Sequence, residues 1–306
     1  MPALVSIVTR TKDRPLFLRR ALRSVLAQTY QDWELIIVDD GGSAGVVDSV
    51  VSEFTRELGD RVRVITHPEP QGRWQAANAG VKAASGTFLI LHDDDDSWAP
   101  TFLQRATEYM AASPDRLGVV SRIEIVWEKR EGDDLVEIGR ELFLPDSVAP
   151  LLMDQQRFNQ FIPIAFLYRR DVHERVGLYD ESLPVIGDWV FNTRVLEIGP
   201  LEYVDEQPLV FWHQRPTASG PDGNSVVASE SDHRRVDALL RDQEFREYLA
   251  REGSGGALYF ERRLRDTEEL LKREFELLRH ESVHPLRLLY RRARERYAAI
   301  RRRSPR

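Results

Sequence analysis

Residues 87–100 have the sequence TFLILHDDDDSWAP, an apolar run followed by four consecutive aspartates. The apolar run, Thr87–Leu91, is short and uninterrupted, as expected of a strand that is buried on both faces. Four adjacent carboxylates repel one another, so the fold must supply cations or hydrogen-bond donors to them. A solvated acidic turn is the alternative, but it does not explain why the charges follow the strand directly. We therefore predict that Asp93–Asp96 form a binding motif at a strand end.

A second acidic pair follows an apolar run earlier in the chain. Leu35–Val38 (LIIV) is a strand candidate, Asp39 and Asp40 follow it, and Gly41-Gly42 end it. Because ligands bind outside the carboxyl ends of parallel strands, we expect both acidic groups to lie at one edge of a sheet. A divalent ion held by one or two carboxylates and by a substrate diphosphate would then explain the local excess of negative charge.

The first hundred residues alternate strand candidates with helical spacing. This alternation predicts an α/β fold with a doubly wound, mostly parallel (Rossmann-like) sheet and right-handed crossovers. One helix is expected to begin at Asp13-Arg14-Pro15, with Asp13 as its cap and Pro15 in its first turn. The expected strands are Leu4–Val8, Leu35–Val38, Val62–Ile65 and Thr87–Leu91, and the other expected helices cover residues 46–54 and 76–84.

The pattern beyond residue 100 is more mixed. Helical patterns cover residues 102–112, 172–176 and 189–198, and residues 214–232 have the Gly, Ser and Pro content of a mobile loop. From Asp232 onward the sequence is charged and helical. We further expect a strand at Gly118–Trp127, a polar turn or loop at Arg130–Glu137, a buried strand within residues 161–169 and a short strand at Leu201–Val204.

Composition excludes several classes of protein. The chain has 306 residues and no cysteine, which rules out disulfides, thiolate metal sites and cysteine nucleophiles. Its first residues are too poor in apolar side chains for a secretory segment, and no apolar run is long enough to span a membrane, so we expect a cytoplasmic protein. The net charge is −7, although residues 279–306 hold ten Arg against two Glu. An acidic body of this kind argues against nucleic-acid binding.

Four segments carry a resemblance to a known family. In chain order they are VSIVTRTKDR, LRSVLAQTYQDWELIIVDDGG, GRWQAANAGVKAASG and LILHDDDDSWAP. The chain resembles the family-2 inverting glycosyltransferases, which have the GT-A fold, densely over residues 4–105 and loosely over residues 160–215. The resemblance implies transfer of a sugar from a nucleoside-diphosphate sugar, with UDP favoured, to a saccharide or lipid-linked acceptor. It also implies a role in polysaccharide, O-antigen or other cell-surface glycan synthesis.

The resemblance implies which residues hold the donor nucleotide. Arg10, Thr11 and Lys12 occupy the loop after the first strand, and Asp39 would accept a hydrogen bond from the imide N–H of the base. The family usually has Pro and Tyr where this chain has Arg10 and Lys12, which indicates extra positive charge near the diphosphate. Arg73, in the third loop, is expected to reach the diphosphate, and a solvated surface arginine is the alternative.

The acidic motif is expected to bind a metal. Aligned on Trp98 and Pro100 with the family pattern, the motif has Asp95 as the chief ligand of Mn²⁺ or Mg²⁺. Asp93 and Asp94 would lie toward the ribose and the water molecules of the metal.

An inverting transfer requires a general base for the acceptor hydroxyl. Asp188 in VIGDWVFNTR is the candidate, because it resembles the E-D or G-D motif that opens a helix on the acceptor side in the family. Gly187 stands where the family commonly has Glu, and a helix-capping role for Asp188 is compatible with catalysis. His213 in VFWHQRP lies where many relatives carry Tyr-Arg-x-His. We expect it to contact the metal or the diphosphate, with a structural role beside aromatic residues as the alternative.

The expected domain organisation has a glycosyltransferase domain at residues 1–230, with a nucleotide-sugar-binding half (1–105) and an acceptor-binding half (106–230). A helical, basic C-terminal extension follows at residues 231–306. Leu264, Leu271 and Leu278 lie seven residues apart, which predicts a helix that packs on a second copy of the chain or on the body. Residues 284–303 alternate apolar residues with Arg, as in helices that lie on anionic membranes, here the inner face of the cell membrane. A solvated tail is the alternative.

Two other functions remain open at this point. A nucleotidyltransferase acting on sugar phosphates would share the sheet and the metal chemistry, but it normally has a Gly-rich loop after the first strand, and TRTKDR contains no glycine. A non-catalytic relative with the same fold is the other alternative. The presence of Asp39, Asp95 and Asp188 argues against it.

Overall fold

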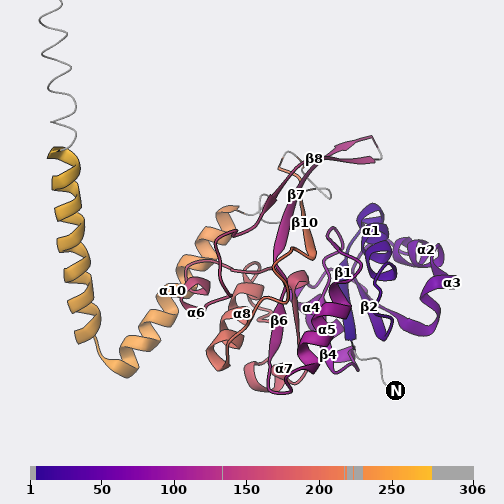
Figure 1. The fold of residues 1–306 in the computed structure, drawn as a ribbon, viewed down its shortest axis with the longest axis horizontal. Coiled ribbons are helices and arrows are strands. Elements are labelled where there is room, and N and C mark those ends of the chain that lie inside the picture. Colours follow the sequence, from indigo (N-terminus) through magenta and orange to yellow (C-terminus); the bar gives the residue numbers. More distant parts are fainter. Residues whose placement is uncertain (1–4, 133, 217, 219–222, 224–229, 278–306) are drawn as a thin grey trace, which may run out of the picture. The chain divides into compact units, whose positions relative to one another are not determined.

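The computed structural model describes residues 5–132, 134–216, 218, 223 and 230–277 (Figure 1). Residue contacts divide the chain into two compact units, residues 1–237 and 238–306. The strands are β1 (Val5–Thr11), β2 (Trp33–Asp40), β3 (Val62–His67), β4 (Phe88–Leu91), β5 (Ser97–Trp98), β6 (Gly118–Val120), β7 (Ile123–Glu131), β8 (Asp134–Leu142), β9 (Phe166–Arg169) and β10 (Val210–Gln214). The α-helices are α1 (Pro15–Leu26), α2 (Val46–Ser52), α3 (Thr55–Leu58), α4 (Arg73–Ala83), α5 (Phe102–Ala111), α6 (Leu152–Gln155), α7 (Val172–Val176), α8 (Gly187–Ile198) and α10 (Glu230–Glu252), and the short 3₁₀ turns are η1 (Gly59–Arg61) and η2 (Pro163–Ala165).

The central sheet has the strand order β3-β2-β1-β4-β9-β6, and the strands from β3 to β4 are all parallel. In the register of β1, Thr11 lies opposite Asp39 and Val8 lies opposite Leu91. The carboxyl ends of β1, β2 and β4 therefore meet at one edge of the sheet. β9 runs antiparallel to both of its neighbours. The predicted α/β fold with a mostly parallel sheet is confirmed.

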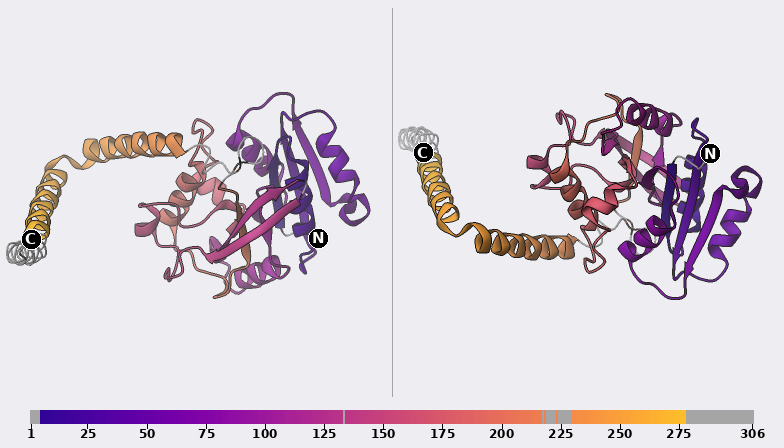
Figure 2. Two further views of the ribbon diagram at one scale, coloured as in Figure 1. Left: turned by 90° about the horizontal axis from the view of Figure 1, so that it is seen from above. Right: turned by 90° about the horizontal axis from the view of Figure 1, so that it is seen from below.

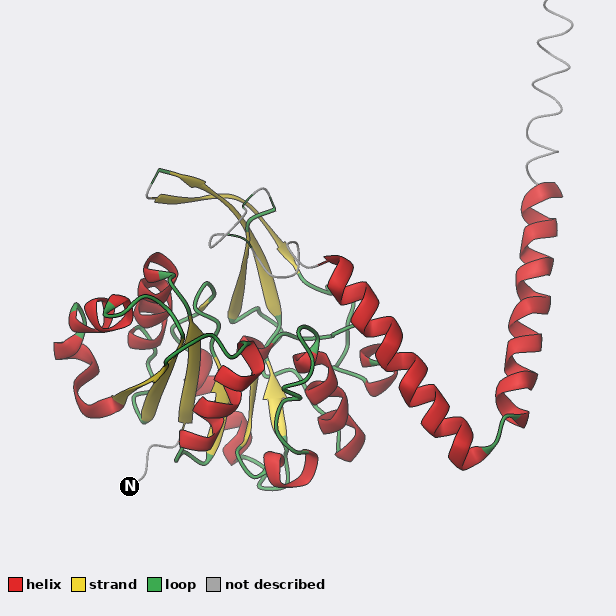
Figure 3. Cartoon of the chain, turned by 180° about the vertical axis from the view of Figure 1, so that it is seen from behind, coloured by secondary structure: helices red, strands yellow, loops and turns green. Residues whose placement is uncertain are grey.

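Helices lie on both sides of the central sheet (Figures 2 and 3). α4 packs on β1 and β2, and it can approach β1 only because residue 80 is glycine. A Cβ at Gly80 would lie 2.2 Å from Cγ1 of Val8. The apolar runs that form β1, β2 and β4 are buried on both faces, as their composition predicted.

The start of α1 differs in one detail from the sequence prediction. Pro15 lies in the first turn as expected, but the residue at the cap position is Arg14 and no side chain caps the helix. Asp13 adopts a left-handed conformation (φ 52°), which Asp tolerates better than most residues, and its carboxylate accepts a hydrogen bond from the Ser43 N–H at 2.7 Å. The predicted capping role of Asp13 is therefore wrong, and Asp13 instead joins two loops at the sheet edge.

A second sheet has the order β5-β10-β7-β8 and corrects two predictions. Arg130–Glu137 was expected to be a loop, yet most of it belongs to the β7–β8 hairpin, which extends beyond the rest of this unit in Figure 1. Gly118–Trp127 was expected to be one strand, but it divides into β6 and β7, which belong to different sheets. Of the short strand expected at Leu201–Val204, the described residues form only a bridge between Val120 and Tyr203.

The described part of the C-terminal region, residues 230–277, is mostly helical, as predicted. α10 is followed by a second helical segment at residues 255–277, whose side chains are almost all exposed. Most of the loop expected at residues 214–232, and all of the amphipathic segment expected at residues 284–303, lie outside the described residues. No described helix combines the length with the apolar character that crossing a bilayer requires.

Candidate active site

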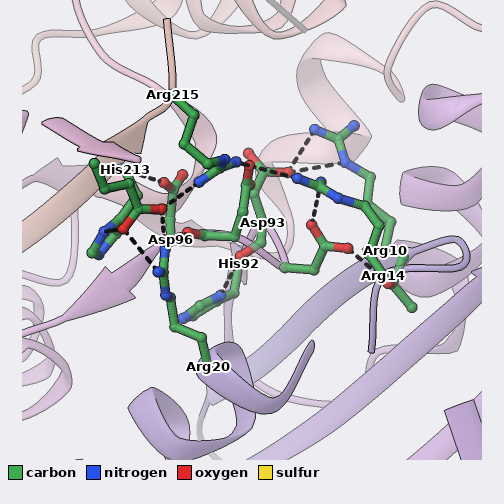
Figure 4. Close-up of polar contacts among 12 residues, drawn as sticks. Arg10, Arg14, Arg20, His92, Asp93, Asp96, His213 and Arg215 are labelled. Carbon is green, nitrogen blue, oxygen red and sulfur yellow. Dashed lines mark hydrogen bonds and ion pairs between the residues drawn. The ribbon is translucent and has the colours of Figure 1, made fainter. Parts of the chain in front are cut away.

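Four arginines and the acidic motif converge at the carboxyl ends of β1 and β4 (Figure 4). Arg10 comes from β1, Arg14 and Arg20 come from the start and the middle of α1, and Arg215 directly follows β10. The motif itself, Asp93–Asp96, follows β4 after a single histidine. The cations that four adjacent carboxylates require are thus supplied by guanidinium groups from three separate segments.

The first two aspartates of the motif face β1. Arg10 donates two hydrogen bonds to Oδ1 of Asp93, at 2.9 and 3.1 Å. The described residues supply no donor to the second oxygen of Asp93, and the side chain of Asp93 is 25% exposed to solvent. Asp94 is buried, and both of its oxygens are used: Thr11 donates to Oδ2 at 2.7 Å and Arg14 to Oδ1 at 2.6 Å. Burial raises the pKa of Asp94 to about 7 despite the charge of Arg14.

The last two aspartates face α1 and β10. Arg14 donates to Oδ2 of Asp95 at 2.9 Å, and Arg215 contacts the same oxygen. Burial works against ionisation of Asp95, but these two guanidinium groups keep its pKa below the ordinary range. Asp96 accepts a hydrogen bond from the His213 N–H at 2.8 Å. Burial, followed by repulsion from Asp95, raises the pKa of Asp96 well above its usual value.

Glu128, on β7, was not identified by the sequence analysis. It is buried and accepts hydrogen bonds from Nη1 and Nη2 of Arg20, at 2.9 and 2.8 Å, and from Arg215 at 2.6 Å. Its contact with Nδ1 of His213 is 3.1 Å. Burial alone would raise the pKa of Glu128, but His213 and Arg20 together lower it to about 2. One signal in the sequence could have identified Glu128. It lies two residues after Val126 in the same strand, so the two side chains share one face of β7, and a charged residue on a buried face needs partners.

His213 lies within this network rather than beside it. Its Nε2 atom is 2.8 Å from the Ser97 hydroxyl, and its Nδ1 atom contacts Glu128. Burial lowers the pKa of His213, with Glu128 acting in the opposite direction. His213 was expected to contact a metal or the diphosphate, but both ring nitrogens already have protein partners. It would have to give up one of them to bind a metal.

Asp39 is the last but one residue of β2, lies opposite Thr11 of β1 and is buried. Its Oδ1 accepts a hydrogen bond from the Gly42 N–H at 3.0 Å, and no described residue donates to its second oxygen. A Cβ at Gly42 would lie 2.6 Å from that Oδ1, so a side chain at this position would displace the carboxylate or the loop. Burial raises the pKa of Asp39. Asp40, in contrast, is fully engaged by the N–H groups of Gln71 and Gly72 and by His67.

Asp188 lies in the first turn of α8 and is half-buried. Asn159 donates to its Oδ2 at 2.8 Å. Burial raises the pKa of Asp188, partly offset by the charge of Arg10. The preceding residue is glycine for a steric reason, because a Cβ at Gly187 would lie 2.6 Å from Cε2 of Trp74. The structure thus explains why this chain has no Glu before Asp188.

Arg73 and Lys12 occupy different surroundings. Arg73 begins α4, and its carbonyl oxygen accepts a hydrogen bond from Arg10 at 3.1 Å. Its charge interacts with those of Arg10, Asp93 and Asp188, so it faces the site. Lys12 is exposed.

The residues present fit one kind of metal site. Within the described residues, no three His, Asp or Glu side chains are grouped so as to hold an ion by themselves. Mg²⁺ and related ions are commonly held by one or two carboxylates, with substrate phosphates and water completing the shell. Two carboxylates fit such a site. Asp93 has one oxygen without a donor among the described residues, and the side chain of Asp95 is 12% exposed. These residues fit a metal ion that is shared with the substrate rather than one held by protein ligands alone.

The fold and these residues together define a glycosyltransferase of the GT-A type. The family model for Glycosyl transferase family 2 matches residues 6–177, which is more than half of the chain. The chain therefore belongs to glycosyl transferase family 2, a family of glycosyltransferase enzymes, and the resemblance inferred from sequence is confirmed.

Similar proteins include two uncharacterized glycosyltransferases. YwdF of Bacillus subtilis is 30% identical over 191 residues, which cover 62% of this chain and 67% of that one. The protein alr2836 of Nostoc is 27% identical over 265 residues, which cover 85% of this chain and 80% of that one. A shorter match, 30% identical over 107 residues, covers 35% of this chain and 42% of TuaG of Bacillus subtilis, a putative teichuronic acid biosynthesis glycosyltransferase.

Among solved structures, residues 1–349 of S. aureus TarS in complex with UDP-GlcNAc superpose on this chain with a TM-score of 0.55. The match covers 72% of this chain and 61% of the TarS chain, with 15% sequence identity. At this identity the similarity shows the fold alone.

Proposed function

We propose that this protein is a metal-dependent, inverting glycosyltransferase that moves a sugar from a nucleoside-diphosphate sugar to an acceptor hydroxyl. The observation that carries the proposal is the meeting of three strand ends, which places Asp39 of β2 at the same edge of the sheet as the arginine network of Asp93 and Asp95. Asp188 lies close enough for its charge to interact with those of Arg10 and Asp93. In this proposal residues 1–230 form the transferase domain, with residues 1–105 holding the donor and residues 106–230 holding the acceptor.

The donor nucleotide is proposed to lie along the ends of β1 and β2. The second oxygen of Asp39, which no described residue engages, is available to accept the imide N–H of uracil or thymine. Thr11 borders this position from the neighbouring strand, and exposed Lys12 adds positive charge near it. Arg10 and Asp93 would lie toward the diphosphate and the ribose of the donor. Asp94 would support them from the buried side of the site, and Arg73 is proposed to contact the donor as well.

Asp95, with Asp93, is proposed to hold a divalent cation, Mn²⁺ or Mg²⁺. When bound, the cation supplies a positive charge that neutralises the departing diphosphate. Arg14 and Arg215 already contact the carboxylate of Asp95. A bound cation would therefore share this carboxylate with two guanidinium groups. His213 acts in this proposal through Glu128 and Ser97, which it contacts, and not as a metal ligand.

Asp188 is proposed as the general base. It accepts the proton of the acceptor hydroxyl while the hydroxyl oxygen bonds to the anomeric carbon and the bond from that carbon to the diphosphate oxygen breaks. Asn159 fixes the carboxylate by donating to Oδ2, and the backbone N–H of Trp189 also donates a hydrogen bond to it. A pKa raised by burial makes the carboxylate a better proton acceptor than an exposed Asp at neutral pH. Attack opposite the leaving group inverts the anomeric centre.

The relatives support the substrate class. TarS was crystallised with UDP-GlcNAc, and TuaG is named for teichuronic acid biosynthesis. We therefore favour UDP as the nucleotide and a saccharide or lipid-linked acceptor, within cell-surface glycan synthesis.

The proposal is tested by calorimetry with UDP, TDP and GDP, each with Mn²⁺ and with EDTA, and by turnover of Asp188→Asn. UDP should bind most tightly, and EDTA should weaken its binding. Asp188→Asn keeps size and polarity but cannot take the proton, so turnover should fall about 10²-fold or more while UDP affinity stays unchanged. Asp48→Asn, an exposed aspartate on α2, is the matched control. Transfer by Asp188→Asn at the parent rate would exclude Asp188 as the base.

A further inference from the structure

The second helix of the C-terminal unit, residues 255–277, presents an apolar stripe to solvent. Its four members are each between 52% and 69% exposed: Phe260, Leu264, Leu271 and Phe275. Successive residues of an α-helix are rotated by about 100°, so these four side chains lie within an arc of about 60° on one face. Helices in folded proteins are stabilised mostly by packing of such a face. A contiguous exposed stripe of this kind is typical of an interaction surface.

The order of residues in the stripe is symmetric. Phe260 and Leu264 are four residues apart, and Leu271 and Phe275 repeat this pair in reverse order about a centre between residues 267 and 268. If a second copy of the helix runs antiparallel about this centre, each Phe lies opposite a Phe and each Leu lies opposite a Leu. A two-fold axis therefore fits the stripe. A parallel pair would also match these residues, so the charges must decide the direction.

The charges of the helix are segregated along its length. Residues 257–265 contain three Arg and one Glu, which gives a net charge of +2. Residues 266–277 contain five Asp or Glu against one Lys and one Arg, which gives a net charge of −3. A parallel pair would place like charges side by side at both ends. An antiparallel pair places the basic half of each copy against the acidic half of the other, and this favours the antiparallel direction.

Individual residues beside the stripe agree with this direction. Arg263 and Glu274 border one side of the stripe, and Glu261 and Lys272 border the other. In the antiparallel pair, Arg263 lies about 3 Å along the helix axis from Glu274 of the second copy, and Glu261 is offset equally from Lys272 of the second copy. Within one helix, Arg263 and Glu274 are about 16 Å apart along the axis, too far to pair.

We propose that residues 255–277 form an antiparallel two-helix interface with the same segment of a second copy of the chain. An interface of this symmetry uses the same surface on both copies, so it closes as a dimer. The apolar stripe supplies the buried area, and the charged pairs beside it set the direction. The interface belongs to the unit of residues 238–306, whereas the residues proposed to hold the donor belong to residues 1–237.

Sedimentation equilibrium of the full chain tests whether the stripe is the interface. The parent should be a dimer. Leu264→Ser removes an apolar side chain from both copies, so the Kd of the dimer should rise about 10²-fold or more. Leu239→Ser is the matched control, because Leu239 is an equally exposed leucine on α10. Its substitution should leave the Kd unchanged.

A charge exchange tests the direction of the two helices. Arg263→Glu places two acidic residues side by side at both ends of the interface, so the Kd should rise about tenfold. The double variant Arg263→Glu/Glu274→Arg restores opposite charges and should return the Kd to that of the parent. Rescue requires the antiparallel direction, because these residues are about 16 Å apart along the axis in a parallel pair. Arg262→Glu, on the opposite face of the helix, changes the net charge equally and should have little effect.

Four results would overturn the proposal. A monomeric parent would exclude the dimer, and a dimer unaffected by Leu264→Ser would use another surface. A double variant as weak as Arg263→Glu would exclude the antiparallel direction. A monomeric parent that binds anionic phospholipid vesicles, and loses them on Leu264→Ser, would assign the stripe to a membrane. The substituted side chains are exposed in the single chain, and circular dichroism with melting temperatures establishes that folded variants are compared.

Discussion

Glu128 connects segments that are far apart in the chain. Its carboxylate joins Arg20 on α1 with Arg215 and His213 at the end of β10. Arg215 and Arg20 then contact the side chain and the carbonyl oxygen of Asp95, respectively. A buried carboxylate with this many charged donors stabilises the site only as part of the whole network, because each partner alone would be an unpaired buried charge. Glu128 therefore positions the arginines around the acidic motif.

Substitution of Glu128 should reveal this role in stability. Glu128→Gln leaves Arg20 without its carboxylate partner and takes one of two from Arg215, which keeps Asp95, so the free energy of unfolding at pH 7 should fall by about 3 kcal/mol. The pKa of Glu128 is about 2 in the folded chain, against an ordinary value of 4.5. Its contribution is therefore fully present above pH 4.5 and is lost as the pH falls toward 2. Urea denaturation at pH 7 and pH 3 measures both effects.

The difference between parent and Glu128→Gln should accordingly be smaller at pH 3 than at pH 7. Glu137→Gln is the control, because Glu137 also pairs with an arginine in the same sheet but is exposed. Its substitution should change the denaturation midpoint little at either pH. A difference between parent and Glu128→Gln that is the same at both pH values would contradict the assignment of the low pKa to Glu128.

Packing of elements sets the geometry that the side chains then use. The close approach of α4 to β1 depends on Gly80, where a Cβ would lie 2.2 Å from Cγ1 of Val8. The same helix carries Arg73 in its first turn and Asn78 in its middle. The amide of Asn78 donates to the carbonyl oxygen of Tyr179 at 2.9 Å. A displacement of α4 would therefore disturb both the central sheet and the segment before Asp188.

Gly80→Ala should lower stability although alanine favours helices. Overpacking against Val8 is expected to cost about 1–3 kcal/mol, and the gain in helix propensity offsets up to about 1 kcal/mol of it. Urea denaturation measures the net change. Gly139→Ala is the control, because a Cβ at residue 139 would lie 3.8 Å from the nearest atom, Cδ1 of Trp127, which is an ordinary van der Waals contact. Equal midpoints for Gly80→Ala and Gly139→Ala would show that α4 has room to adjust.

The sequence predicted the elements whose burial is visible in local pattern. β1, β2 and β4 are short apolar runs followed by polar residues, and their position in a parallel sheet follows from strand–helix alternation. The β7–β8 hairpin was missed because its outer half is exposed and charged, with the composition of a loop. Its strands are held by pairing with each other and with β10, which no local pattern reports.

The same limit applies to the site. Sequence motifs indicated the carboxylates, because aspartates directly after buried strands need an explanation. They did not indicate which cations would meet them. Arg20 contacts Glu128, 108 residues away, and Arg215 contacts Asp95, 120 residues away. Such partners depend on how two sheets come together, so they emerge only from the folded chain.

The C-terminal unit differs in character from the unit that carries the site. Leu264 and Leu271, whose spacing predicted a packed helix, are 62% and 52% exposed in the single chain. Exposed apolar side chains at this spacing favour burial against a second copy or a membrane. The basic amphipathic segment predicted at residues 284–303 lies outside the described residues, and its sequence alone argues for an anionic surface. The two hypotheses differ in their dependence on lipid and on salt.

Deletion of residues 284–306 distinguishes binding to a membrane from contact between copies of the chain. If this segment binds a membrane surface, the parent should sediment with anionic vesicles and the deletion variant should not. Salt should weaken the binding, because the Debye length falls from about 10 Å at 0.1 M to about 3 Å at 1 M, while the apolar contribution survives. UDP affinity should be equal in both proteins, since the proposed donor site lies within residues 10–95. Equal sedimentation of the two proteins, or equal binding to neutral and anionic vesicles, would contradict membrane binding by residues 284–306 and leave this segment as a contact between copies of the chain or as a solvated tail.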